Sequence, residues 1–210
     1  MSEYAFLIAI AAALLGGAMS PGPSFLVVAQ NSLSKSRLHG LLSSVGTGLG
    51  AAVFALLAAL GVTALLDQTP AAYFAFRVIG GLYLLWLAYL IWRGATQPLL
   101  HNDQQSAGYS GLFGSLVKGF VVQISNPKTI FIIASIFSAL MPAQPPVNTA
   151  VYVALIAFVV DFGWYAIVAF SLSESRSRDF YQRTKVYFDR FAAGLLLLLS
   201  SKLFFELLVN

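Results

Sequence analysis

Two prolines and a glycine interrupt an otherwise apolar segment near the start of the chain. The segment runs from about residue 4 to residue 32, and the interruption is Ser20-Pro21-Gly22-Pro23-Ser24. Proline lacks a backbone N–H and its ring clashes with the preceding helical turn, so a helix cannot continue through this stretch. Broken backbone at membrane depth is stable only where it is buried in protein or lines a wet cavity. The interruption therefore predicts an internal site rather than a surface turn.

A second interruption of the same kind follows 105 positions later, which is half the length of this 210-residue chain. Residues 125–129 align with residues 20–24 without gaps, and a β-branched apolar run follows both. Paired, interrupted hydrophobic segments in two halves of a chain indicate a transporter binding site. We therefore predict one transmembrane transporter domain, 1–210, duplicated as repeats of about 1–100 and 110–210. The candidate substrate-binding residues are Ser20, Pro21, Gly22, Pro23, Ser24, Asn126, Pro127, Lys128 and Thr129.

Composition identifies an integral membrane protein. Charged residues are 10% of the chain, against about 25% in ordinary soluble domains, and hydrophobic residues are 59%. The chain has no cysteine, which excludes thiol chemistry and cysteine-ligated metals, and its two histidines, His39 and His101, fall in expected loops. No Walker-type phosphate loop is present, which disfavours ATP as an energy source. We expect no metal site, no cofactor and no nucleic-acid partner.

Six apolar segments of about 20 residues or more fit the chain. The basic residues fall in the connections after the first, third and fifth segments, and Lys and Arg mark cytoplasmic loops. This distribution places both termini outside the cytoplasmic membrane. Three spans per half then make the halves an inverted repeat, with the first and fourth helices broken. The expected spans are residues 4–32, 40–66, 71–92, 114–140, 149–172 and 191–209.

Lys128 and Asp161 are charges inside expected spans, where each costs about 2.5 to 3.5 kcal/mol at the bilayer centre. Two explanations remain open. The residues could form a mutual ion pair that joins the fourth and fifth spans. Alternatively, Lys128 binds a substrate carboxylate while Asp161 binds the substrate amine or cycles a proton, because desolvation favours the protonated form of an isolated carboxylate.

Further polar side chains lie on the interrupted spans: Gln30, Asn31 and Gln123. They could contact substrate, but capping of the broken backbone or bonding to a neighbouring helix explains them equally well. The freed N–H groups at the start of each half-helix carry partial positive charge that suits a carboxylate. These features again favour a small anionic or zwitterionic ligand at the two breaks.

These residues together resemble the LysE/RhtB family of amino-acid exporters. Met19 to Pro23 closes the first span, Asn126 to Lys128 interrupts the fourth, and Asp161 to Trp164 lies in the fifth. The resemblance covers essentially the whole chain. It implies a six-helix inner-membrane protein that exports amino acids or related metabolites in exchange for protons, with a homodimer as the suspected assembly. Many members have an acidic residue where this chain has Ala51, so the resemblance implies a neutral amino acid or derivative rather than a cationic one.

We therefore predict a secondary active exporter of amino acids or close analogues, without enzyme activity, in contact with the lipid bilayer. Two alternatives stay open: an exporter of another small solute, such as a metal ion or a stress metabolite, and a non-transporting membrane scaffold subunit. Metal transport is disfavoured because we count Asp161 as the single acidic residue within the spans, with no cluster of ligands to replace a hydration shell.

Overall fold

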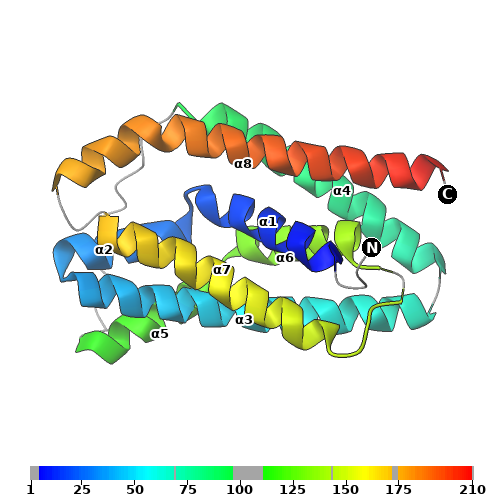
Figure 1. Cartoon of the computed structure of the whole chain (residues 1–210), viewed down its shortest axis with the longest axis horizontal. Helices are drawn as coiled ribbons and strands as arrows, with labels where there is room; N and C mark the ends of the chain where they lie inside the picture. The colour runs from blue at the N-terminus through cyan, green and yellow to red at the C-terminus, as the bar shows by residue number, and fades with distance from the viewer. Residues whose placement is uncertain (1–4, 69, 97–110, 143, 172–174, 210) are drawn as a thin grey trace.

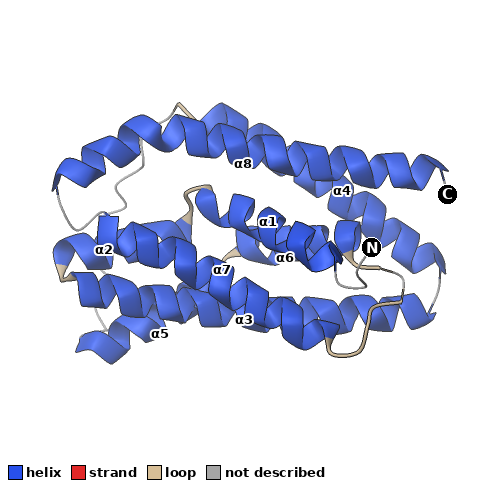
Figure 2. Ribbon diagram, in the orientation of Figure 1, coloured by secondary structure: helices blue, strands red, loops and turns tan. Residues whose placement is uncertain are grey.

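The computed structural model describes residues 5–68, 70–96, 111–142, 144–171 and 175–209, and all regular structure in these ranges is α-helical (Figure 1, Figure 2). The expected all-α class is confirmed for this part of the chain. The helices are α1 (Ala5–Met19), α2 (Pro23–Ser34), α3 (Arg37–Gln68), α4 (Pro70–Gly94), α5 (Gly111–Ile124), α6 (Pro127–Leu140), α7 (Thr149–Ser171) and α8 (Ser175–Val209).

Both expected helix breaks are present. Helices α1 and α2 meet at an angle of 61°, and α5 and α6 meet at 57°. Pro23 opens α2, where its missing N–H costs nothing because the first turn has no intrahelical partner for it. Asn126 lies just before α6, and its side chain accepts a hydrogen bond from the backbone N–H of Lys128 (3.1 Å). Local proline and capping chemistry therefore explains where both helices restart.

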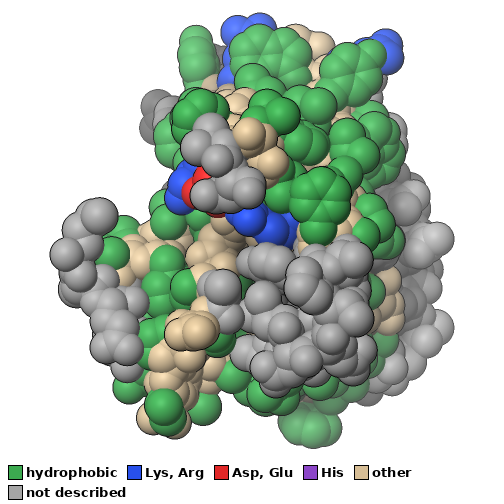
Figure 3. Space-filling view, turned by 90° about the vertical axis from the view of Figure 1, so that its right-hand side faces the viewer, with side chains coloured by type: hydrophobic (Ala, Val, Ile, Leu, Met, Phe, Trp, Pro, Cys, Tyr) green, Lys and Arg blue, Asp and Glu red, His purple; other side chains and the backbone are tan. Residues whose placement is uncertain are grey.

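Three helical segments are long and apolar enough to cross a membrane by length and composition: Arg37–Gly61, Thr149–Ser171 and Thr184–Leu208. The number rises to five if each bent pair counts as one span. On its described residues, α4 is not among these five, so the six-span repeat stays a prediction. Large hydrophobic side chains are exposed along the helices, and Figure 3 shows hydrophobic side chains over much of one end of the molecule. Such an exterior suits lipid rather than water.

Helix α3 is the centre of the packing. It lies against α7 and α5 and also contacts α2 and α6, while α4 and α8 run side by side along one edge of the bundle (Figure 1). The α3 and α5 backbones touch at two glycines. A Cβ added to Gly46 would lie 2.0 Å from the carbonyl oxygen of Leu116, and one added to Gly119 would lie 2.2 Å from that of Ser43. Small residues allow this close approach between membrane helices.

Helix α8 differs from the sequence prediction. We expected a charged connector as far as Arg190 and a last span from residue 191, but α8 begins at Ser175 and its candidate span begins at Thr184. The count of one acidic residue within the spans is wrong: Glu206 lies within the expected last span, 191–209, and the earlier start at Thr184 adds Asp189. Charged residues in a sequence indicate where the apolar layer ends, but they do not end a helix. A helix can continue beyond that layer, and it can also bury charges that have partners.

The charges on the α4–α8 edge have partners. Arg77 of α4 donates to Glu206 of α8 at 2.6 Å, and Lys202 lies 3.6 Å from the same carboxylate. Lys185 donates to Asp189 at 2.7 Å within α8. These contacts reduce the cost of placing charges in apolar surroundings.

Candidate functional site

The two helix breaks lie against each other, although they are far apart in the sequence. The Asn126 amide, at the start of α6, donates to the hydroxyl of Ser24 in the first turn of α2 (3.2 Å). The Ser24 hydroxyl in turn donates to the side-chain oxygen of Gln123, the residue near the end of α5. All three side chains are buried. The contact joins the end of α5 and the starts of α2 and α6 at one point.

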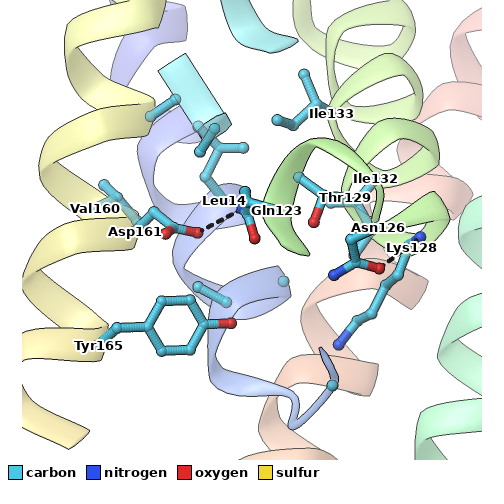
Figure 4. A pocket seen from close by; sticks show the side chains of 15 residues that line it. Leu14, Gln123, Asn126, Lys128, Thr129, Ile132, Ile133, Val160, Asp161 and Tyr165 are labelled. Carbon is cyan, nitrogen blue, oxygen red and sulfur yellow. Dashed lines mark hydrogen bonds between the residues drawn. The ribbon is translucent and has the colours of Figure 1, made fainter. Parts of the chain in front are cut away.

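Asp161 extends this polar contact to α7. The Gln123 amide nitrogen donates to Asp161 Oδ2 at 3.1 Å, so a continuous chain of hydrogen bonds runs from Asn126 through Ser24 and Gln123 to the carboxyl group (Figure 4). Asp161 is 8% exposed, and its Oδ1 has no hydrogen-bond partner among the described residues. The fifth expected span therefore supplies a buried acidic group to the site made by the two breaks.

Lys128 takes a different direction from Asp161. Its ammonium donates to the backbone carbonyl of Ser20 at 2.7 Å, and its side chain passes beside Gly22 in the link between α1 and α2. Figure 4 shows the Lys128 side chain running toward that link, with its end apart from the Asp161 carboxyl group. The mutual ion pair, one of the two alternatives left by the sequence, is not formed. Each charge instead has a separate polar partner.

A cavity of about 40 Å³ lies between these groups (Figure 4). This volume accommodates a few water molecules, whereas an apolar cavity that binds benzene measures about 150 Å³. Apolar side chains from α1, α6 and α7 form much of its wall, including Leu14, Ile132 and Val160. The polar side chains that line it are Gln123, Asn126, Lys128, Thr129, Asp161 and Tyr165.

Some of the remaining predicted site residues line the cavity, and others lie in the helix breaks beside it. Gly22 and Thr129 line the cavity, and Ser20 contributes its carbonyl to Lys128. Pro21 belongs to the link, and Pro23 and Pro127 begin α2 and α6. Asn126, which we predicted to bind substrate, caps α6 with its side chain and also lines the cavity.

Asn31 also has a structural partner. Its amide donates to the Ser43 hydroxyl on α3 at 2.7 Å, which is the helix-to-helix bond that we set beside substrate contact. Gln123, in contrast, lines the cavity and connects both breaks with Asp161. The sequence did not separate these two residues, because both are polar side chains on an interrupted span.

Tyr165 is a lining residue that the sequence analysis did not identify. It lies four positions after Asp161 on α7, and Ala157 lies four positions before it; all three line the cavity. Residues four apart share one face of a helix. This spacing could have identified Tyr165 from the sequence, because it lies on the same face of the helix as the acidic residue Asp161.

A family model for LysE type translocators matches residues 15–207, which is most of the chain. The chain belongs to the LysE-type translocator family. Relatives of known description cover most of its length. A threonine efflux protein of Escherichia coli K12 is 30% identical over 84% of this chain and 86% of its own, and one of Salmonella typhi is 31% identical over the same shares. A leucine efflux protein of Enterobacter sp. strain 638 is 27% identical over 85% of this chain and 83% of its own. No solved structure matches this translocator.

The family resemblance noted from the sequence is thereby confirmed. The structure also shows where Ala51 lies. This residue of α3 is buried and lines the same cavity as Asp161 and Lys128. An acidic side chain at position 51 would therefore add a second carboxylate to the wall of this cavity. In this translocator the position contributes a methyl group instead.

Proposed function

We propose that this LysE-type translocator exports a neutral amino acid across the cytoplasmic membrane by proton-coupled secondary active transport. The observation that carries the proposal is the chain of hydrogen bonds that joins both helix breaks to one buried carboxyl group beside a cavity. The family and the relatives described as threonine and leucine efflux proteins support an amino acid as the substrate.

The cavity wall supports a substrate with one carboxylate and no net positive charge. The Lys128 ammonium has three N–H groups and uses one on the Ser20 carbonyl, so it can donate to a substrate carboxylate. Asp161 lies on another wall of the cavity and can accept from the substrate amine or carry the coupled proton. Ala51 removes the second acidic group that a cationic side chain would need. Leu14, Ile132 and Ile133 offer apolar contact to the substrate side chain.

The proposed transport cycle requires the cavity to enlarge. Its volume of about 40 Å³ fits water but not an amino acid, which is expected of a transporter between its open states. Two inverted three-helix repeats, about 1–100 and 110–210, would provide the motion, because each contributes one bent helix pair to the site. We further propose one transporter domain with six spans, both termini outside, in the inner membrane and assembled as a homodimer.

The first prediction concerns Lys128. In a host without its own exporters, loaded with dipeptides, we expect selective efflux of one or a few neutral amino acids. Lys128→Met keeps the length of the side chain but removes the donor to the substrate carboxylate, so efflux should fall by about tenfold or more, the loss expected for a charge-assisted hydrogen bond. The measurement is amino-acid release into the medium, with membrane insertion checked for both proteins.

A matched control is Lys202→Met on α8, whose ammonium is exposed on the α4–α8 edge. This variant should retain wild-type efflux. Equal loss in both variants would assign the effect to membrane insertion. No amino-acid efflux from well-inserted wild-type protein would overturn the proposed function and favour another small solute.

The second prediction separates a transporter from a scaffold subunit. The chain has no cysteine, so single cysteines can be introduced without background. Gly22→Cys is sterically acceptable because an added Cβ would be 3.5 Å from the nearest atom and the backbone is extended. A transporter exposes this position to water in at least one state, and a hydrophilic thiol reagent should modify Gly22→Cys and Thr129→Cys. Ala55→Cys, in the apolar core, is the dry control. A scaffold would leave all three cysteines unmodified.

A further inference from the structure

A second buried carboxylate, Asp189 of α8, lies outside the site described above. The residue is 2% exposed. Its Oδ2 accepts from Lys185 at 2.7 Å, while its Oδ1 is buried without a hydrogen-bond partner in the described ranges. Lys185 has two further acceptors at the end of α4, the carbonyls of Gly94 (2.9 Å) and Ala95 (3.3 Å). Lys185 is therefore fully engaged, whereas one oxygen of Asp189 is not.

The fold brings Asp189 toward the α1–α2 break. The neighbouring residue, Phe188, packs against the cluster of Phe25 and Tyr165, which belong to the first turn of α2 and to the cavity wall. The rings of Phe188 and Trp164 meet edge to face, with centroids 5.6 Å apart. Helix α8 also packs on α1, since an added Cβ at Gly16 would lie 2.6 Å from the Leu195 side chain.

Lys128 at the start of α6 and Asp189 of α8 are opposite charges on two helices that pack against each other beside this break. One group has spare hydrogen-bond donors and the other has a spare acceptor. The Lys128 ammonium has N–H groups left after its bond to the Ser20 carbonyl, and Asp189 Oδ1 lacks a donor. Figure 4 shows the Lys128 side chain directed toward the α1–α2 link.

We propose that Asp189 is the internal counter-ion of Lys128 and that the carboxylate of the transported amino acid competes with it for the ammonium. This inference rests on the proposed function, because it assumes that Lys128 binds a substrate carboxylate. An unpaired charge in an apolar protein interior is costly, so an exporter that releases its substrate needs a partner for the vacated lysine. Asp189 is thus a positioning residue: it weakens substrate binding and promotes release.

A purely structural role for Asp189 makes different predictions. In that case Asp189 only holds Lys185, and Lys185 joins α8 to the end of α4. Removing either member of the pair should then reduce the amount of folded protein in the same way, with no change in substrate affinity. Competition for Lys128 instead predicts a lower KM for the Asp189 variant alone.

The experiment measures KM and maximal rate for radiolabelled threonine in liposomes that contain the full chain. Asp189→Asn should lower KM by about tenfold, which equals ~1.4 kcal/mol of lost competition, and should lower the maximal rate because release slows. Asp189→Glu should return both constants toward wild type. Lys185→Gln keeps a donor for the α4 carbonyls but releases Asp189 from its partner, so KM should stay unchanged or rise. In a Lys128→Met background, Asp189→Asn should have no further effect on KM.

The outcomes separate this inference from the proposed function. Wild-type protein that transports none of the amino acids tested contradicts the proposed function itself. Active wild-type protein with an unchanged or raised KM in Asp189→Asn overturns the counter-ion inference alone, as does an equal change in Lys185→Gln. If Asp189→Asn fails to insert because Lys185 is left uncompensated, the double variant Lys185→Gln/Asp189→Asn removes both charges and is held to the same KM criterion.

Discussion

Replacing Gly46 with alanine is expected to remove most of the folded protein from the membrane. An added Cβ would lie 2.0 Å from the carbonyl oxygen of Leu116 and 2.7 Å from the backbone nitrogen of Phe120, both on α5. Backbone atoms cannot rotate away as side-chain atoms can, so α3 and α5 must separate. Overpacking of this kind costs about 3 kcal/mol or more, a large fraction of the stability of a single domain. The measurement is the monodisperse fraction of detergent-extracted protein and its thermal midpoint.

Gly61 is the matched control on the same helix. An added Cβ at Gly61 would meet no atom within 4 Å. Gly61→Ala should therefore leave the folded fraction unchanged or raise it slightly, because alanine favours the helix by about 1 kcal/mol over glycine. Gly119→Ala should repeat the Gly46→Ala result from the opposite helix, since it would meet the Ser43 carbonyl. Normal folding of both interface variants would contradict the close α3–α5 contact.

The second expected span, 40–66, contains several glycines, but the sequence alone could not assign each glycine to a partner. Gly46 and Gly50 lie four positions apart and both face α5, where Gly50 meets Gln123. Gly48 lies on the other side and meets Phe158 and Phe162 of α7. The helical period fixes which glycines share a face. Which helix packs on that face depends on contacts between segments far apart in the chain, and a single sequence does not reveal those contacts.

The two helix breaks were predictable because proline acts on its own backbone. The restart of α2 at Pro23 and of α6 at Pro127 needs no information about tertiary structure. The prediction that both breaks adjoin one site required the repeat argument as well, and the hydrogen bond between Ser24 and Asn126 places them together. The role of Gln123 between them was not predictable, because its nearest partners come from α2 and α7.

The start of α8 shows the limit of reading charges as loops. Lys185 and Asp189 belong to a run of charged residues, which composition alone assigns to water. In the structure both are buried, because Lys185 meets the end of α4 as well as Asp189. Pairing across elements makes such burial tolerable. A sequence-based prediction of membrane depth cannot detect that pairing, so it missed Asp189 as a second buried carboxylate.

Asp161→Asn is expected to abolish concentrative export while leaving exchange of substrate across the membrane intact. The asparagine side chain has the volume of aspartate, and its amide oxygen can still accept from Gln123. Binding geometry at the cavity is therefore preserved. The amide cannot take up and release a proton, so substrate movement loses its link to the proton gradient. Export should then stop at equal concentrations on the two sides, even with a pH gradient imposed.

The measurement compares two assays on one preparation of proteoliposomes: accumulation of labelled threonine driven by a pH gradient, and exchange of labelled for unlabelled threonine without a gradient. Asp161→Glu is the matched variant, because it keeps a titratable carboxyl group and should retain some gradient-driven transport. Loss of both activities in Asp161→Asn, with normal folding, would make Asp161 a binding residue for the substrate amine. Gradient-driven accumulation at the wild-type level would remove Asp161 from the coupling mechanism and make Asp189, a second buried carboxylate among the described residues, the next candidate.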